Sequence, residues 1–192
     1  MPRVAPFEEH HARYEAWFEE HAAACISELL ALRPLVPWRG RGIEIGGGSG
    51  RFAAPLGVEV GVDTSPDMLA RAAARGITSV EGTAEDLPFA AAGFDHALIA
   101  TTVCFVDSPA RMLSDMHRVL RPRGRLVIGF IDRESALSRD YLAHQAESLF
   151  YRDATFCSAG EVEQLLLGCH GLVAAGFHAT AWSDLRSRFR RS

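Results

Sequence analysis

The chain has 192 residues, and because single domains run to roughly 100 to 200 residues, one domain with one core is expected. Hydrophobic residues make up 48% and charged residues 23% of the chain; these values exclude a disordered polymer and a disulfide-stapled miniprotein. All 20 basic residues are Arg, and the chain contains neither Lys nor Asn. Schiff-base chemistry on Lys, phosphate binding by a P-loop or kinase Lys, and N-linked glycosylation are therefore excluded.

The formal net charge is -4, which argues against a nucleic-acid partner and favours small-molecule chemistry. Five acidic residues and no continuous apolar segment occupy the first 20 positions, so no secretory signal is expected and the protein is predicted to be cytoplasmic, without membrane contact. The four cysteines are Cys25, Cys104, Cys157 and Cys169. Their spacing matches no metal-binding motif, so no metal is predicted.

The first predicted element is an amphipathic helix over residues 7–32, which ends before Pro34. A short apolar strand over 41–45 then enters a glycine cluster. A second strand over 58–63 is followed by Ser65 and Pro66, a cap and a first-turn proline that begin a helix running to about residue 75.

Three more apolar strands are predicted over residues 77–80, 94–101 and 125–131, and a sixth over 172–182. Ser108 with Pro109 begins a helix that the RPRG sequence ends, and a capping box of Ser158 and Glu161 begins another. Alternating strands and helices at this spacing predict an α/β fold, a doubly wound sheet that binds ligands at the carboxyl ends of its strands.

The glycine cluster is the sharpest motif. Gly46, Gly48 and Gly50 follow a strand, where they allow close approach of the backbone to a ligand and present a helix N-terminus to an anion. A dinucleotide fold requires G-x-G-x-x-G, but Arg51 occupies the position of the third glycine. Glu44 would repel a diphosphate and attract an ammonium group.

A second acid, Asp63, lies 19 residues after Glu44, where doubly wound folds place a ribose-binding carboxylate. A ligand with a carboxylate for the helix end and an ammonium for Glu44 is an amino acid, and an amino acid joined to a nucleoside is S-adenosylmethionine. The alternative for the glycines alone is a tight strand-to-helix turn that binds nothing.

With these motifs, residues 14–134 resemble the class I S-adenosylmethionine-dependent methyltransferases, in the branch of small single-domain enzymes of ubiquinone and menaquinone biosynthesis. Residues 44–50 match the E/D-x-G-x-G-x-G motif of that family in full. The resemblance implies a Rossmann-like, mostly parallel sheet of six strands, or seven if the final antiparallel strand is present. Helices cover both faces, and an N-terminal helix and a lid after the fifth strand complete the fold.

The resemblance also implies the residues that bind S-adenosylmethionine and its product S-adenosylhomocysteine. Asp63 is expected on the ribose, Met68 or Thr64 beside the adenine, and the Ala84 amide on the adenine edge. Thr83 stands where the family often has Asp, so the bond to the adenine amino group comes from Thr83 or Glu85, or is lost. The implied cofactor-binding set is Tyr14, Glu44, Gly46, Gly48, Asp63, Thr64, Met68, Thr83, Ala84, Glu85 and Thr101.

Three segments are expected to wall the acceptor pocket: the first helix, the loop after the fourth strand, and the insertion over 132–157. Its predicted lining residues are Trp17, Thr102, Phe105, Arg133, Tyr141, His144 and Tyr151. Trp17 is equally compatible with core packing, and a lone His144 is more often a surface residue. Methyl transfer depends mainly on positioning, so no catalytic triad is expected and no catalytic residue is assigned.

The chain is divided into an N-terminal helix region (1–38), a cofactor-binding core (39–131), a lid (132–157) and a last helix, strand and basic tail (158–192). The predicted function is methyl transfer to a small-molecule acceptor. The alternative is a non-enzymatic S-adenosylmethionine-binding regulatory or partner protein. An edge strand left open by a shortened C-terminal hairpin is either exposed or covered by a partner, as in a homodimer.

Overall fold

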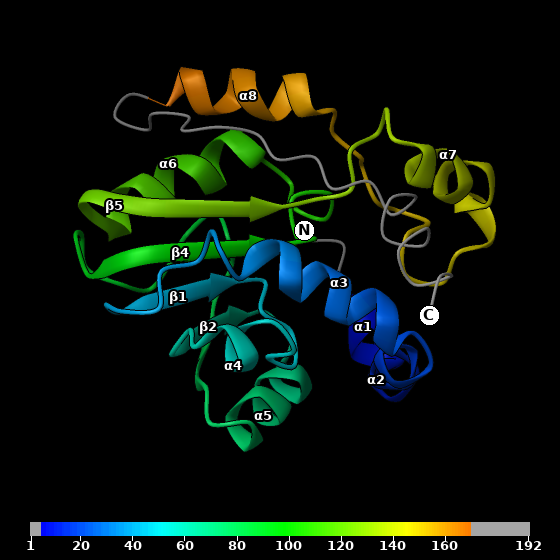
Figure 1. Cartoon of the computed structure of the whole chain (residues 1–192), viewed down its shortest axis with the longest axis horizontal. Helices are drawn as coiled ribbons and strands as arrows, with labels where there is room; N and C mark the ends of the chain where they lie inside the picture. The colour runs from blue at the N-terminus through cyan, green and yellow to red at the C-terminus, as the bar shows by residue number, and fades with distance from the viewer. Residues whose placement is uncertain (1–4, 170–192) are drawn as a thin grey trace.

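The computed structural model describes residues 5–169 and contains a five-stranded, entirely parallel sheet with the order β3-β2-β1-β4-β5. The strands are β1 (Gly42–Ile45), β2 (Val60–Asp63), β3 (Thr78–Glu81), β4 (Phe94–Ala100) and β5 (Leu120–Gly129). The carboxyl ends of the strands all lie at the same end of the sheet, where the N-terminal helices and α7 gather (Figure 1). The predicted Rossmann-like architecture is confirmed.

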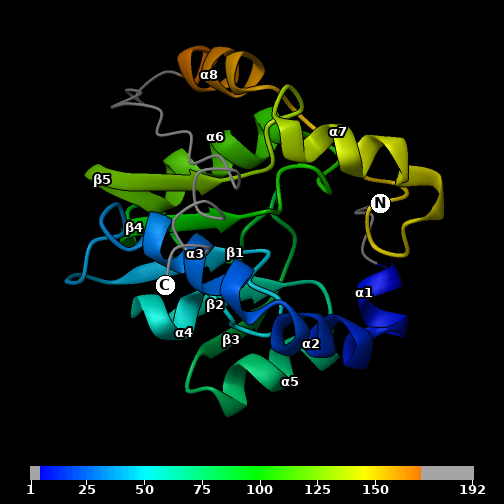
Figure 2. The same ribbon diagram turned by 45° about the vertical axis from the view of Figure 1, so that its right-hand side comes forward.

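Helices cover both faces of the sheet (Figures 1 and 2), as predicted. One face packs on α6 (Pro109–Val119) and α8 (Ala159–Gly168) through a core that includes Ile43, Ile99 and Met116. The other face packs on the N-terminal helices, α4 (Ala53–Leu56) and α5 (Pro66–Ala74). The apolar strands are thus buried from both sides, as expected for a parallel sheet.

The prediction of a single continuous helix over 7–32 is wrong. The chain forms three helices instead, α1 (Ala5–Glu9), α2 (His11–Glu20) and α3 (Ala22–Leu32). The breaks fall at His10 and His21, and the His21 ring bonds the Trp17 carbonyl at 3.0 Å. Apolar residues continue at helical spacing across both breaks, so periodicity alone did not reveal them.

The predicted helix starts are confirmed. Ser65 and Ser108 accept hydrogen bonds from the amides three residues later, each followed by proline, and Ser158 and Glu161 form the reciprocal capping box. The helix that begins at Ser108 ends at Val119, just before RPRG, as predicted. The fifth strand, predicted over 125–131, instead begins at Leu120, and a register shift between Phe94 and His96 accommodates the extra residues.

The insertion after β5 contains α7 (Ala136–Ala143) and the short 3₁₀ helix η1 (Gln145–Glu147). The predicted sixth strand at 172–182 lies outside the described residues. Within residues 5–169, no helix is long and apolar enough to cross a membrane.

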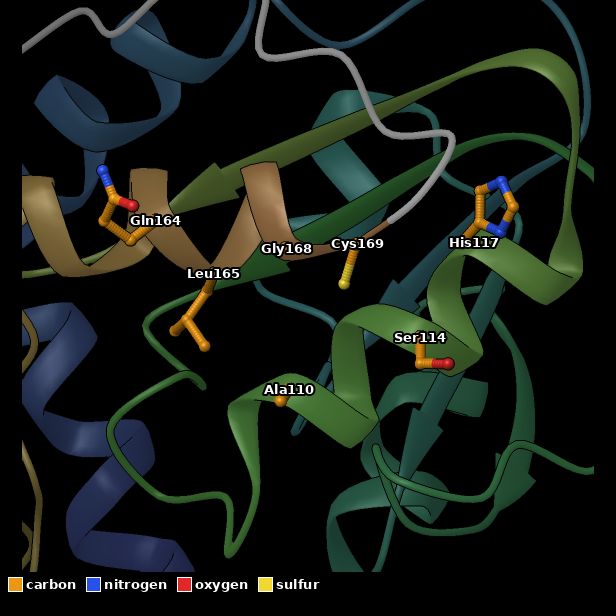
Figure 3. Close-up of a pocket in the computed structure, with 7 residues that line it drawn as sticks. All are labelled: Ala110, Ser114, His117, Gln164, Leu165, Gly168 and Cys169. Carbon is orange, nitrogen blue, oxygen red and sulfur yellow. The ribbon is translucent and has the colours of Figure 1, made fainter.

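Figure 3 shows a groove between α6 and α8 whose lining contains no residue of the glycine loop: Ala110, Ser114, His117, Gln164, Leu165, Gly168 and Cys169.

Candidate functional site

The glycine loop leaves β1 in a conformation that favours glycine. Gly46, Gly48 and Gly50 have φ angles of 63°, 51° and 78°, in the left-handed region where a side chain is strained. A Cβ on Gly46 would also lie 2.5 Å from Oγ1 of Thr102. The Thr102 hydroxyl lies 3.2 Å from the Ile45 carbonyl oxygen and 3.1 Å from that of Ala100. Thr102 therefore fastens the loop to the end of β4.

The helix after the loop is short, because α4 is only four residues long. A helix this short has little dipole, so the backbone amides of the loop itself are the groups available to bind an anion. One of them is already engaged: the Gly48 amide donates to Oδ2 of Asp63 at 2.8 Å.

Asp63 ends β2 beside the loop. Its second oxygen, Oδ1, accepts from the Ser65 amide at 3.0 Å, and burial raises the pKa of its carboxyl group despite these bonds. Asp63 thus shapes the loop through Gly48 while its carboxylate keeps further lone pairs for a ligand.

Glu44 lies on β1, only 1% exposed. Burial raises the pKa of its carboxyl group to about 8, with a smaller contribution from the charge of Asp63, while a backbone hydrogen bond from Ala53 acts in the opposite direction. Its Oε2 atom has no hydrogen-bond partner within the described residues. The structure brings the two predicted acids together, and one of them is an unsatisfied buried carboxyl, the kind of group that a cationic ligand would complete.

Tyr14 on α2 lies over the same loop. Its hydroxyl oxygen is 3.7 Å from the point where a Gly48 Cβ would stand. Burial raises the pKa of its phenol strongly, and the negative charges of Glu44 and Asp63 add to this effect. Tyr14 therefore lies over the glycine loop, and its contact with the methionine part of the cofactor stays a prediction.

The residues predicted near the adenine follow β2 and β3. Met68 on α5 is fully buried, and the Thr64 hydroxyl is buried without a partner within residues 5–169. Thr83 forms an isolated bridge with Asp86, and Ala84 is half-buried beside it. Contacts of these residues with an adenine stay predictions.

Glu85 is hydrogen-bonded to the backbone at the start of α6. Its Oε1 atom accepts from the amides of Asp107 at 2.8 Å and Ser108 at 3.2 Å. These bonds hold the segment after β3 to the start of α6.

Thr101, at the end of β4, has a φ angle of 56°. This conformation is costly for a β-branched residue and is typically retained at functional positions. Its amide bonds the Gly129 carbonyl at 2.8 Å, which holds the strained residue against the end of β5.

An aromatic cluster joins the three segments predicted to wall the acceptor pocket. Its members are Phe7, Tyr14, Phe105, Tyr141, Phe150, Tyr151 and Phe156. The Phe7 ring centroid lies 5.0 Å from Phe105 and 5.5 Å from Tyr14. Phe105 in turn lies 5.5 Å from Tyr151 in the lid. Cys104 is buried beside these rings, as expected for a small apolar residue.

The remaining predicted lining residues lie elsewhere or have other contacts. Arg133 pairs with Glu161 at 2.8 Å and donates to the Phe156 carbonyl, which joins the start of the insertion to α8. His144 is exposed at the start of η1. The Trp17 ring stacks on His21 at 4.7 Å, a packing role that the sequence left open.

Sequence reasoning missed two features. Glu15 on α2 forms ion pairs with Arg51 and Arg75, and Glu28 on α3 is a half-buried acid whose pKa burial raises to about 7. The spacing of Glu28 from Cys25 and Leu32, both on the packed side of α3, was the available signal for the second feature.

The fold and the glycine loop define a doubly wound α/β protein, and comparison with known proteins shows which family it belongs to. Residues 43–128 match the family model described as a methyltransferase domain. A solved structure from Thermotoga maritima, described as an S-adenosylmethionine-dependent methyltransferase and possible histamine N-methyltransferase, is 44% identical. The match covers 86% of this chain and 79% of the other, with a TM-score of 0.83.

An uncharacterised protein of Methanocaldococcus jannaschii is 42% identical over 83% of this chain and 78% of its own length. An uncharacterised Mycobacterium tuberculosis protein is 40% identical over 81% of this chain, which spans 56% of that longer relative. The chain belongs to the S-adenosylmethionine-dependent methyltransferases.

Proposed function

We propose that the protein transfers the methyl group of S-adenosylmethionine to a small-molecule acceptor. The observation that carries this proposal is the pair of acids at the ends of adjacent strands, Glu44 and Asp63, around a glycine loop with positive φ angles. The unsatisfied Oε2 of Glu44 suits an ammonium group, and the carboxylate of Asp63 suits sugar hydroxyls.

The residues present fit this cofactor. Glu44 would hold the amino end, Asp63 the ribose, and Gly46 and Gly48 would allow close approach of the backbone. Tyr14 would close the site from α2. When bound, the cofactor supplies a methyl group on a cationic sulfur that becomes neutral on transfer, so the protein has little charge to stabilise and acts mainly by positioning.

The aromatic cluster supports a small acceptor. Rings from α1, from the loop after β4 and from the lid converge at the carboxyl end of the sheet, which is a surface suited to an organic molecule. The description of the Thermotoga maritima relative as a possible histamine N-methyltransferase also supports a small-molecule acceptor.

Calorimetric titration with S-adenosylmethionine and S-adenosylhomocysteine tests the cofactor assignment. Both are expected to bind, and Asp63→Ala is expected to weaken binding at least about tenfold, the effect of losing roughly 1.4 kcal/mol. Absence of binding, or no effect of Asp63→Ala, would refute the proposal. Release of S-adenosylhomocysteine in the presence of a metabolite extract then separates an enzyme from a protein that only binds the cofactor.

A further inference from the structure

Five arginines gather at the end of the sheet where the strands begin, opposite the glycine loop. Two of them lie in the segment between α3 and β1, and three lie in the first residues of β5. In Figure 1 this end of the sheet lies away from α1, α2 and α7. All five residues are exposed, and together they form a basic face: Arg39, Arg41, Arg121, Arg123 and Arg125.

Asp95, at the start of β4, connects the two groups of arginines. The Arg41 amide donates to its Oδ2 atom at 2.8 Å, and Nη1 of Arg121 lies 2.6 Å from its Oδ1 atom. Arg125 donates from Nη1 to the Leu35 carbonyl at 3.2 Å. The start of β5 is therefore held against the segment before β1, and the five arginines belong to one surface.

The positive charge of the basic face is largely unbalanced. Of its five members, only Arg121 forms an ion pair with an acid among the described residues, and that acid is Asp95. Glu59, directly before β2, is a second acid at this end of the strands. Five guanidinium groups thus stand against these two carboxylates, which gives a local positive field in a chain whose net charge is -4. A field of this sign attracts an anionic partner.

Trp38 adds an apolar side chain next to the basic face. It is 71% exposed, more than any other large hydrophobic residue in the described part of the chain. The guanidinium carbon of its neighbour Arg39 lies 4.2 Å from the ring centroid. A tryptophan ring beside a guanidinium group is typical of the membrane–water interface, where the ring enters the headgroup layer and the charge stays at the phosphates.

We propose that the basic face and Trp38 bind the surface of a bilayer that contains anionic phospholipids. The arginines supply the attraction to lipid phosphates and Trp38 supplies an apolar anchor, and the strength of such binding depends on both. Because the face lies at the amino ends of the strands, the glycine loop at their carboxyl ends points away from the bilayer. The inference does not depend on methyl transfer.

The sequence alone predicted no membrane contact, from the acidic residues in the first 20 positions. Those residues do not report how arginines that are distant in the sequence gather at one end of the sheet. Binding at the surface also requires no helix that spans the bilayer.

A nucleic acid is the competing polyanion. Single strands bind to proteins through several aromatic rings on which successive bases stack. In the described part of this face Trp38 is the one exposed ring, because Phe94 beneath Arg41 is buried, and a guanidinium group already covers the Trp38 ring. The arrangement therefore favours a lipid surface.

The test is co-sedimentation of the full chain with lipid vesicles. Vesicles of phosphatidylcholine and phosphatidylglycerol in a ratio of about two to one should bind the protein, with an affinity that falls as the salt concentration rises. Vesicles of phosphatidylcholine alone should bind it much more weakly. Lipids with brominated acyl chains should quench the tryptophan fluorescence, and Trp38→Ala should lose this quenching and bind about tenfold more weakly.

The charge requirement is tested with a double variant, Arg39→Gln with Arg123→Gln. Neither side chain forms a hydrogen bond or an ion pair with another described residue, so the change removes charge and no such contact. Each arginine near an anionic surface contributes about fivefold to the affinity, and the loss should be roughly thirtyfold. The matched control, Arg13→Gln with Arg111→Gln, removes the same charge from exposed positions on α2 and α6 and should bind like the wild type.

Unchanged thermal unfolding shows that each variant is folded. Absence of binding to anionic vesicles, equal losses in the two double variants, or quenching that persists in Trp38→Ala would overturn the inference. Binding of a homopolymer RNA that is lost in Arg39→Gln with Arg123→Gln, without vesicle binding, would overturn it as well and assign the face to nucleic acid. Binding of S-adenosylhomocysteine tests the proposed function separately.

Discussion

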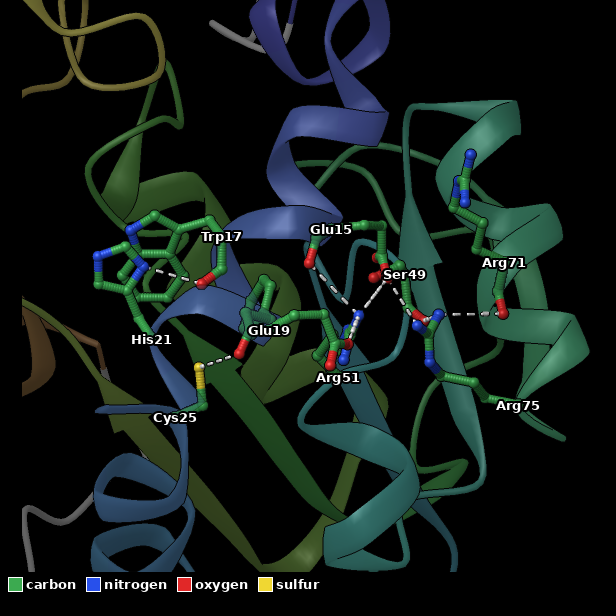
Figure 4. Close-up of polar contacts among 10 residues, drawn as sticks. Glu15, Trp17, Glu19, His21, Cys25, Ser49, Arg51, Arg71 and Arg75 are labelled. Atoms are coloured by element: carbon green, nitrogen blue, oxygen red, sulfur yellow. Dashed lines mark hydrogen bonds and ion pairs between the residues drawn. The ribbon is translucent and has the colours of Figure 1, made fainter. Parts of the chain in front are cut away.

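Glu15 on α2 and Arg51 in the glycine loop form an ion pair in which Oε2 lies 2.6 Å from Nη2. Arg75, at the end of α5, donates to the same oxygen at 2.7 Å and to the Ser49 carbonyl at 2.8 Å. Figure 4 shows both guanidinium groups converging on Glu15. This network fixes α2, and with it Tyr14, above the loop that is proposed to hold the cofactor.

Arg51→Ala is expected to loosen α2 from the core. Glu15 is 14% exposed, and hydrogen bonds to charged groups contribute about 1.5 to 3 kcal/mol each. Both the free energy of unfolding in urea and the affinity for S-adenosylhomocysteine should fall. Arg71→Ala is the matched control, because its guanidinium points away from Glu15 in Figure 4. Equal effects of the two substitutions would contradict a clamping role.

Local signals explain what the sequence could predict. The strand ends at Ile45 and Asp63, the glycine loop, and the serine caps at Ser65 and Ser108 depend on residues a few positions apart. Their chemistry is visible in the printed letters, and so the position of the site at the carboxyl edge followed as well.

Contacts between distant residues could not be predicted in this way. The pairing of Glu15 with Arg75 spans 60 positions, and the contact of the Phe7 and Phe105 rings depends on how α1 packs against the loop after β4. The breaks at His10 and His21 also escaped, because apolar spacing continues through them.

Cofactor binding is expected to release a proton from Glu44. With a pKa of about 8, its carboxyl group is mostly protonated at pH 7 in the cofactor-free protein, and an ammonium ligand favours the ionised form. Titration at pH 7 in buffers of different ionisation enthalpy should therefore show release of close to one proton per cofactor. Glu44→Gln should abolish this release and weaken binding; a release that persists in this variant would assign it to another group.

The same residue makes the cofactor-free protein less stable as the pH rises. Because the pKa of Glu44 in the folded state lies above its ordinary value of 4.5, ionisation is more costly in the folded than in the unfolded state. Stability should fall between about pH 4.5 and about pH 8 and then level off. Thermal unfolding of Glu44→Gln should show a smaller decline over this range, and parallel curves for the two proteins would show that Glu44 is not responsible.

Asp63→Asn is expected to weaken the loop and the cofactor site together. The amide side chain keeps one oxygen acceptor, so the bonds from Gly48 and Ser65 cannot both remain. Loss of one charged bond, about 1.5 to 3 kcal/mol, predicts a loss of S-adenosylhomocysteine affinity of about tenfold or more. Asp67→Asn, exposed on α5, is the control and should bind normally. Comparable affinities of the two variants would leave Asp63 without a role in binding.

Gly46→Ala should destabilise the protein more than a positive φ angle alone explains. The φ angle of 63° costs about 1 to 3 kcal/mol for a residue with a Cβ, and that Cβ would in addition lie 2.5 Å from Oγ1 of Thr102. Gly57→Ala is the matched control, since its φ angle is 76° but its Cβ would meet nothing within 4 Å. Gly57→Ala should lower the free energy of unfolding only by the cost of the positive φ angle.

Thr102→Ala identifies the source of the excess cost. This substitution removes the Oγ1 and Cγ2 atoms that crowd position 46 but leaves the Thr102 Cβ, 2.9 Å from the new methyl group. In a double-mutant cycle measured by urea unfolding, Gly46→Ala with Thr102→Ala should therefore be less destabilising than the sum of the two single changes. Simple additivity would show that the loop can move away from β4, and that Thr102 does not hold it there.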